Sequence, residues 1–430
     1  MRATWLPLSW CLLLTILLVA VPVHLGAQES DGSTSSDSPY VIEYPDEIPP
    51  PMPMADEGIY DILNILLLGS DTENPRNAGR TDVLLIASIN RTTNTVSFLS
   101  LPRDLYVYIP GERVYRINSA YGFGQRRDGG GAELISETIR YNLGIEIDYY
   151  ARVDFGEFRT IIDALGGVDI TVDCLIEDWK LKDPDADPSV EENWEIFTLP
   201  VGLYHMDGEL ALWYARSRRT TSDFDRGRRH QALLRAIWRR VRELGLIQQA
   251  AELWAQVSSI VETDIDVQDV IGLLPLAASL DNYHLRSFVF RQNQEVTGWV
   301  SPEGSSVLVP NRELIASLIE ALYLPSPIRT LVEETPRVLI VNASGYRALA
   351  LVAADRLAWE GYSVTISSEM IPYQDRTNLT DLTGRTKGNM VRTLQSVLRL
   401  DEGQMEFAPD GERQYDYILT LGADFSACGR

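Results

Sequence analysis

The chain has 430 residues and carries 61 acidic against 38 basic residues, which gives a formal net charge of −23 at pH 7. Such an acidic balance argues against a nucleic-acid-binding protein, because the phosphate backbone would be repelled. The length is sufficient for more than one domain.

The chain begins with an apolar stretch. Arg2 precedes the run from Leu6 to Leu25, and polar sequence follows Gly26-Ala27. This pattern predicts a cleaved signal peptide or a retained membrane anchor over residues 1–27, and both alternatives place the rest of the chain outside the cytoplasm, secreted or membrane-anchored at the cell envelope. Residues 28–58 are acidic, Ser-rich and then Pro-rich, which predicts a disordered tether.

Two short apolar runs then predict neighbouring strands with aspartates at their ends. Residues 62–68 lead to Asp71, and Asp82 leads into residues 83–87. A hairpin-like connection would bring both carboxylates to one sheet edge. Two hard oxygen ligands beside a diphosphate suit Mg²⁺, although each aspartate taken alone could be a turn residue.

A third apolar run, residues 95–101, predicts another strand. It ends in Pro102-Arg103-Asp104 and adds an arginine to the strand ends. No general base can be singled out, and Asp82 and Asp104 remain alternative candidates. The cysteines lack Cys-x-x-Cys spacing and the chain has four histidines, so the sequence gives little support to a zinc site or a Cys-His dyad.

Residues 213–231 concentrate arginines in an otherwise acidic chain. Arginine keeps its charge and its planar fork matches phosphate, so the cluster predicts a pyrophosphate-sized ligand. Residues 210–214 are interpreted as an extended segment. In that geometry Arg216 and Arg218 leave one face and grip one ligand together.

A helix is predicted from Asp225, with Asp223 as its N-cap. Its buried stripe is expected to comprise Leu233, Leu234, Ile237 and Val241. In the first turn the same stripe carries Arg226, Arg229 and His230, for which ion pairs at the rim of the core are the alternative role. The outer, solvated face is expected to carry Arg228, Arg235, Arg239 and Arg242.

The last quarter of the chain predicts a second domain. A Pro-containing linker, residues 324–335, precedes residues 336–430, in which strand-like and helix-like runs alternate. The alternation predicts a small α/β domain, and it contains no catalytic constellation.

Seven sequence runs, in this order, resemble the LytR-CpsA-Psr family of cell-envelope glycopolymer transferases: LLLGSD, GRTD, LSLPRDLYVYIPG, RINSAY, IIDALGGVDITV, YHMDGELALWYARSR and DFDRGRRHQ. The resemblance covers residues 59–323. It implies an α/β domain with a central mixed sheet flanked by helices, and an apolar tunnel for a polyprenyl chain. Tunnel-wall candidates, for which core packing is the alternative, are Phe155, Phe158, Ile161 and Ile162.

The resemblance also assigns roles to residues. Asp71 and Asp82 match aspartates associated with Mg²⁺ or Mn²⁺. The catalytic candidates are these two aspartates together with Arg80, Arg103 and Asp104. The matching pyrophosphate-binding arginines are Arg80, Arg103, Arg216, Arg218 and Arg226, with Arg229 and His230 as further candidates. His230 stands where many members have Gln, so we expect pH-dependent binding if the ring is not heavily desolvated.

The implied activity is transfer of a glycopolymer from a polyprenyl-pyrophosphate carrier to a cell-wall acceptor, with peptidoglycan as the expected acceptor and the membrane as the source of donor. Arginines and a metal ion can stabilise such phosphoryl transfer without a protein nucleophile. A polyprenyl-pyrophosphate hydrolase and a non-catalytic, lipid-binding regulatory protein remain alternatives. Residues 336–430 resemble the LytR C-terminal domain.

Overall fold

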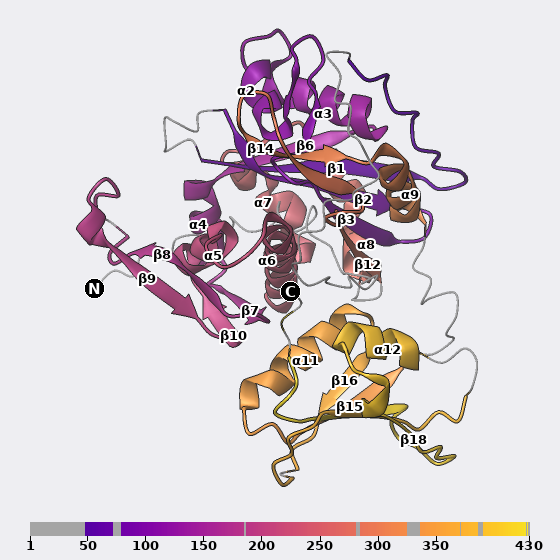
Figure 1. Cartoon of the computed structure of the whole chain (residues 1–430). Helices are drawn as coiled ribbons and strands as arrows, with labels where there is room; N and C mark the ends of the chain where they lie inside the picture. Colours follow the sequence, from indigo (N-terminus) through magenta and orange to yellow (C-terminus); the bar gives the residue numbers. More distant parts are fainter. Residues whose placement is uncertain are drawn as a thin grey trace.

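The computed structural model describes residues 48–71, 79–184, 186–280, 284–324, 336–369, 371–385, 390–426 and 428. The predicted segment 1–27 and most of the predicted linker 324–335 lie outside these ranges. Within them, no helix is both long enough and apolar enough to cross a membrane. Two α/β units lie along the chain, a larger N-terminal one and a smaller C-terminal one (Figure 1).

The larger unit is built on a mixed six-stranded sheet. The β1–β2 and β2–β3 pairs are antiparallel, whereas β6 runs parallel to β1 and β12 runs parallel to β3. The strands, in their order across the sheet, are β11 (Glu262–Thr263), β6 (Tyr149–Asp154), β1 (Ile62–Ser70), β2 (Thr81–Asn90), β3 (Thr95–Ser100) and β12 (Leu285–Val289).

The central strands are apolar on both faces because helices cover both. Successive residues of a strand point to opposite faces. Accordingly Ile65 and Leu85 join one buried cluster, and Leu66 and Ile86 join the other. The helices packed on the first cluster are α4 (Phe155–Ala164), α5 (Gly208–Arg216), α6 (Asp223–Glu243), α7 (Ala250–Val257) and α8 (Val267–Ser279). Those packed on the second are α2 (Ala120–Gly124), α3 (Gly130–Leu143) and α9 (Arg312–Tyr323).

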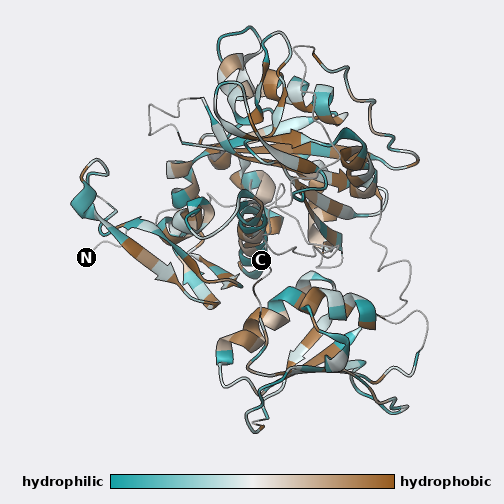
Figure 2. Cartoon of the chain, viewed as in Figure 1, coloured by the Kyte–Doolittle hydropathy of each residue, from teal (hydrophilic) through white to brown (hydrophobic). Residues whose placement is uncertain are grey.

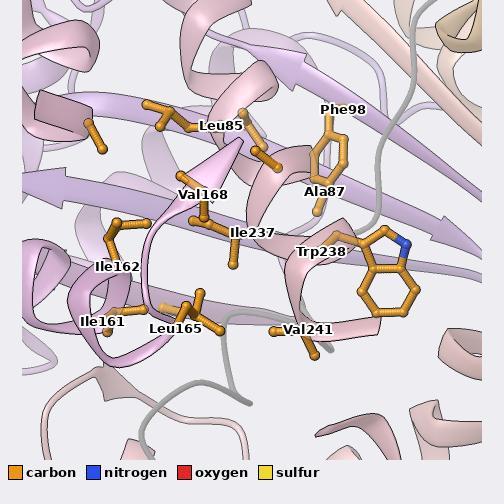
Figure 3. Packing of buried hydrophobic residues seen from close by; sticks show 14 of the residues in the cluster. Leu85, Ala87, Phe98, Ile161, Ile162, Leu165, Val168, Ile237, Trp238 and Val241 are labelled. Carbon is orange, nitrogen blue, oxygen red and sulfur yellow. The ribbon is translucent and has the colours of Figure 1, made fainter. Parts of the chain in front are cut away.

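Figure 3 shows Ile237, Trp238 and Val241 of α6 in the first cluster, together with Leu85 and Phe98 of the sheet. Ile237 and Val241 are fully buried, so the predicted apolar stripe of this helix is confirmed. Ile161 and Ile162 of α4 also lie in this core, where they contribute packing.

Short two-stranded ribbons and 3-10 turns complete the larger unit. The ribbons are β4 (Tyr106–Tyr108) with β5 (Val114–Arg116), β7 (Val168–Val172) with β10 (Gly202–Met206), β8 (Ile176–Leu181) with β9 (Trp194–Leu199), and β13 (Val296–Val300) with β14 (Ser306–Pro310). The 3-10 turns are η3 (Ile117–Ser119), η4 (Glu191–Asn193) and η5 (Leu246–Gln249).

The structure corrects two predictions about local conformation. Residues 210–214, expected to be extended, belong to helix α5, because Asp207 accepts a hydrogen bond from the Leu210 amide and caps the helix. An apolar run of this length cannot be assigned to strand or helix by its pattern alone. Helix α6 begins at Asp223 rather than Asp225, since Ser222 is its N-cap and exchanges hydrogen bonds with Asp225.

The end of the predicted tether also packs on the larger unit. The Met52 amide donates to the Tyr141 carbonyl, and the Tyr141 hydroxyl donates to the Pro49 carbonyl. Met52 is 8% exposed. The backbones of Pro49, Met52 and Ala55 therefore form hydrogen bonds with α3 or with Gly144 directly after it.

The smaller unit confirms the predicted C-terminal α/β region. Its five-stranded sheet has the order β16-β15-β19-β17-β18. The elements are β15 (Arg337–Asn342), α11 (Arg347–Trp359), β16 (Ser363–Ile366), β17 (Asn378–Asp381), α12 (Val391–Leu398), η7 (Glu402–Gln404), β18 (Met405–Phe407) and β19 (Tyr417–Leu421). Apolar side chains of the strands and helices form a separate core between them.

The two units are joined through α11 and a disulfide bond. Cys174 pairs with Cys428, and Arg239 of α6 forms an ion pair with Asp355 of α11 at 3.0 Å. Arg235 of α6 lies over the Trp359 ring and is 5% exposed. Its prediction as a solvated residue was wrong, because α11 covers this part of α6.

Candidate functional site

The β1–β2 hairpin brings the predicted aspartates to one edge of the sheet. Ser70 is paired with Thr81, so Asp71 and Asp82 follow directly on adjoining strands. A Cβ atom on Gly69 would lie 2.9 Å from Val83, and this crowding requires glycine here. The hairpin predicted from the two apolar runs is confirmed.

Asp71 faces the C-terminal end of helix α5. Its carboxylate is buried, and Oδ2 lies 3.2 Å from Nη2 of Arg216. The Arg216 guanidinium also lies over the Phe155 ring, 4.6 Å from its centroid, and the side chain is 52% exposed. Arg216 therefore holds Asp71 while remaining accessible to a ligand from solvent.

A second charged cluster surrounds Arg103. This guanidinium donates to Asp82 at 2.8 Å and lies 3.5 Å from Asp104 and 3.6 Å from Asp223. Burial alone would lower the pKa of Arg103, but the three carboxylates raise it instead. Asp223 also forms an ion pair with Arg226 at 2.9 Å.

Burial raises the pKa of Asp104, and the negative charge of Asp223 raises it further. The positive charges of Arg103 and Arg116 lower this pKa but do not cancel the increase. Arg116 lies 3.2 Å from Asp104. Sequence reasoning missed Arg116 and read Asp223 only as a cap. The position of Asp223 three residues before Arg226 was the available signal, since residues at this spacing are neighbours on a helix.

Arg229 holds the loop that follows α5, residues 217–221, called here the arginine loop. Its guanidinium donates to the carbonyls of Tyr214 and Ser217 and, at 3.0 Å, to the Thr221 hydroxyl. Its side chain is 5% exposed. The expected direct contact with pyrophosphate is thus not supported for Arg229, which instead positions the backbone that carries Arg218.

His230 does not behave as the sequence suggested. Its Nε2 donates to the Ala215 carbonyl at 3.1 Å. Desolvation, reinforced by the charges of Arg226 and Arg229, lowers the pKa of His230 to about 3. The ring is therefore neutral between pH 6 and 8, and the condition for pH-dependent binding, an imidazole that is not heavily desolvated, fails.

The structure leaves the Arg80 and Arg218 side chains exposed. Arg80 precedes β2, and Arg218 lies in the arginine loop, where Asp178 accepts hydrogen bonds from the Arg218 and Arg219 amides. Among the described residues, neither the Arg80 nor the Arg218 side chain forms an ion pair with a carboxylate. Asp178 was missed because an acid on a distant strand gives no local sequence signal.

An apolar cavity of about 110 Å³ opens beside these charges. Phe155 and Phe158 line it as predicted, whereas Ile161 and Ile162 do not. Strands β1, β2 and β6 and helices α4, α5 and α6 supply most of the other lining residues, which are Leu67, Leu68, Gly69, Val83, Leu85, Ala151, Val153, Leu212, Ala215, His230, Leu233, Leu234 and Val261.

The donors at the sheet edge fit a hard cation that shares its coordination with a ligand. Asp71 and Asp82 supply carboxylate oxygens, and the buried hydroxyls of Ser70 and Thr81 have no hydrogen-bond partner in the described part of the chain. That part holds no group of three or more His, Cys, Asp or Glu suited to a metal. Mg²⁺ commonly uses one or two carboxylates together with phosphates, so the edge suits Mg²⁺ only beside a phosphorylated ligand.

Comparison with known proteins gives relatives that match about half of this chain. The chain is 30% identical over 226 residues to the polyisoprenyl-teichoic acid–peptidoglycan teichoic acid transferase TagT of Bacillus subtilis, covering 51% of this chain and 65% of that protein. It is 33% identical over 224 residues to the corresponding TagU of Oceanobacillus iheyensis, covering 52% and 65%. The chain thus spans slightly less than two thirds of these relatives.

The crystal structure of B. subtilis TagV aligns with 62% of this chain and 99% of its own, at 24% identity and a TM-score of 0.49. The LytR_cpsA_psr family profile matches residues 52–322, which include the β1–β2 hairpin, the arginine loop and helix α6. The chain therefore belongs to the LytR_cpsA_psr family.

Proposed function

We propose that this protein transfers a glycopolymer from a polyprenyl-pyrophosphate carrier to peptidoglycan. The observation that carries the proposal is the adjacency of two unlike surfaces. The apolar cavity is lined by Leu68 and Gly69, and the same strand then reaches Asp71 and its partner Arg216. A long apolar chain ending in a diphosphate has this same division between an apolar part and a charged part. The relatives named as polyisoprenyl-teichoic acid transferases support the same assignment.

The charged residues would act on the diphosphate mainly by position and charge. Arg216, Arg218 and Arg80 are exposed to solvent and would hold the phosphate oxygens. Arg103 and Arg226 lie deeper and would stabilise charge that develops on the leaving phosphate. Such preorganised donors are the main protein contribution to phosphoryl transfer.

Asp71 and Asp82 would hold Mg²⁺ or Mn²⁺, assisted by the hydroxyls of Ser70 and Thr81. The ion, when bound, would neutralise phosphate charge during transfer. Asp104 is the preferred candidate to accept the proton of the acceptor hydroxyl, because its raised pKa makes it a better base than an ordinary aspartate. Asp82 is assigned to the metal instead.

A transfer assay tests the proposal. Purified full-length protein is incubated with a polyprenyl-pyrophosphate-linked oligosaccharide, Mg²⁺ and uncrosslinked peptidoglycan strands. We expect glycan joined to peptidoglycan through a phosphodiester and release of polyprenyl monophosphate. Release of lipid phosphate at the same rate without peptidoglycan would identify a hydrolase. Binding of the donor with no turnover under any condition would identify a lipid-binding protein.

The proposed metal is tested in the same assay. Asp82→Asn should abolish most of the activity while leaving the melting temperature near that of the wild type, because Asp82 lies at the sheet edge. Equal activity in excess chelator and in added Mg²⁺ would contradict the metal assignment.

We further propose an extracytoplasmic location at the cell envelope, with the N-terminal apolar stretch as signal or anchor. The Cys174–Cys428 disulfide supports an oxidising compartment. We also propose that the C-terminal α/β unit is a LytR C-terminal domain, on the basis of its order of strands and helices.

A further inference from the structure

The β8–β9 hairpin projects from the larger unit beside α5 (Figure 1). Cross-strand partners share one face of a hairpin. On the outer face Trp179 pairs with Ile196, and Leu181 pairs with Trp194. Trp179 is 51% exposed and Ile196 is 40% exposed. Trp179 and Ile196 therefore form an exposed apolar pair beside the partly buried Leu181 and Trp194, and such surfaces commonly mark binding sites.

The opposite face of the hairpin is packed and fixes its orientation. The Phe197 ring meets the Trp213 ring of α5 edge to face at 5.0 Å. The Trp213 indole also donates to the Trp179 carbonyl at 2.9 Å. The backbone at Trp179 is thus held to helix α5 of the larger unit, while the Trp179 ring is exposed to solvent.

The hairpin is also bonded to the proposed phosphate site. The Glu177 amide donates to the Thr220 hydroxyl at 3.0 Å, and Glu177 forms an ion pair with Arg219. Thr220 and Arg219 belong to the arginine loop. A chain that begins at a phosphate held by this loop therefore has a continuous path onto the outer face of the hairpin.

The negative charge of the hairpin restricts which kinds of polymer can bind along this path. Residues 176–199 contain eight acidic and two basic residues. Figure 2 shows the tip as hydrophilic and the strands with apolar segments. A polymer with repeating phosphates would meet like charge along this hairpin, and like-charge juxtaposition disfavours binding. An uncharged sugar chain would meet no such repulsion.

We propose that the outer face of the β8–β9 hairpin binds the first sugars of an uncharged glycan, and that it selects such glycans over polyol-phosphate polymers. This inference rests on the proposed function and names the substrate class of that same site. The apolar C–H face of a sugar ring packs on an aromatic face, while its hydroxyls reach the surrounding carboxylates. A membrane contact is disfavoured because the acidic tip would be repelled by anionic lipid headgroups.

The test compares two donors of equal polyprenyl length. One carries a neutral hexose oligosaccharide and the other carries poly(glycerol phosphate) on the same first sugar. With full-length protein in detergent, we expect kcat/KM to favour the neutral donor by about tenfold or more, because the repeating phosphates of the other donor lie against like charge on the hairpin. The preference should shrink as salt rises, because salt screens the acidic hairpin.

Variants assign the effect to the hairpin. Trp179→Ala should raise KM for the neutral donor about tenfold with little change in kcat, and Trp179→Phe should restore most of the loss. Replacing Glu191, Glu192 and Glu195 together by Gln should improve the poly(glycerol phosphate) donor selectively. The matched control is Tyr373→Ala, which removes an aromatic ring that is 63% exposed in the C-terminal unit and should change neither donor.

Binding of the free neutral hexasaccharide, measured by calorimetry, separates this inference from the proposed function. Failure to turn over either donor overturns the transferase proposal, whereas hexasaccharide binding that is lost in Trp179→Ala still supports the sugar site. Equal kcat/KM for both donors, or unchanged hexasaccharide binding in Trp179→Ala, overturns the inference. Loss of vesicle binding or of a dimer in Trp179→Ala, without loss of sugar binding, would show that the face meets lipid or a second copy.

Discussion

Two arginines of the site form ion pairs with the aspartates that are proposed to hold the metal. Arg216 lies against Asp71, and Arg103 lies against Asp82. A diphosphate must compete with these partners for the guanidinium donors. A cation on Asp71 and Asp82 would relieve that competition, so we expect metal and diphosphate to strengthen each other's binding.

Removing one guanidinium should weaken ligand binding only where that guanidinium faces the ligand. Arg216→Ala should weaken binding of a polyprenyl pyrophosphate by about 1.5–3 kcal/mol, the range for a hydrogen bond to a charged group. Arg239→Ala is the control, because Arg239 pairs with Asp355 at the junction of the two units. Calorimetric titration of both variants checks this, and equal losses would show that the charged edge is not where the diphosphate binds.

His230 should make binding insensitive to pH between 6 and 8. Its pKa of about 3 keeps the ring neutral there, in contrast to the sequence-based expectation. The unfolded chain takes up this proton near pH 6.5, so stability should fall as pH drops from 6.5 towards 3. In His230→Gln the stability loss in that window should be smaller. Chemical denaturation of both proteins from pH 7 to 4 measures the free energy of unfolding at each pH. If this free energy changes equally with pH in both proteins, His230 does not cause the loss of stability.

At the level of elements, the apolar strands were predictable and the environment of the arginines was not. Residues 62–68, 83–87 and 95–101 lie within β1, β2 and β3 or at their ends, because runs buried on both faces have a strong sequence signal. The extended reading of residues 210–214 failed since only Asp207, outside the run, identifies helix α5. Burial of Arg235 depends on Trp359, a contact distant in sequence, which no local pattern predicts.

Helix α6 carries Arg226 in its first turn, so the N-cap should affect both stability and binding. The Ser222 hydroxyl accepts from the Asp225 amide, and Asp225 accepts from the Ser222 amide. Ser222→Ala should reduce stability by about 1 kcal/mol and weaken diphosphate binding. Ser222→Asp preserves a cap and should leave the melting temperature nearly unchanged. A similar loss in both variants would show that the position matters for something other than capping.

At the scale of the whole molecule, helix α6 connects the proposed site to the second unit. Its first turn holds Arg226 at the charged edge, while Arg235 and Arg239, further along, meet Trp359 and Asp355 of α11. The Tyr346 hydroxyl adds a hydrogen bond to the Val201 carbonyl at 2.9 Å. The C-terminal unit thus supports the helix that carries the deep arginine of the site.

The Cys174–Cys428 bond should be the strongest single constraint on this arrangement. It joins residues 254 positions apart, and a crosslink across so long a loop removes much of the entropy of the unfolded chain. Cys428→Ser should therefore lower stability by on the order of 2–4 kcal/mol. Calorimetry should also show one unfolding transition in the oxidised protein and two in the variant, since non-covalent contacts around α11, such as the Arg239–Asp355 ion pair and the packing of Trp359, then join the units without a crosslink. Cys11→Ser is the control and should keep the single transition. If the Cys428→Ser protein had the same melting temperature as the wild type, the α6–α11 contacts alone would hold the units together.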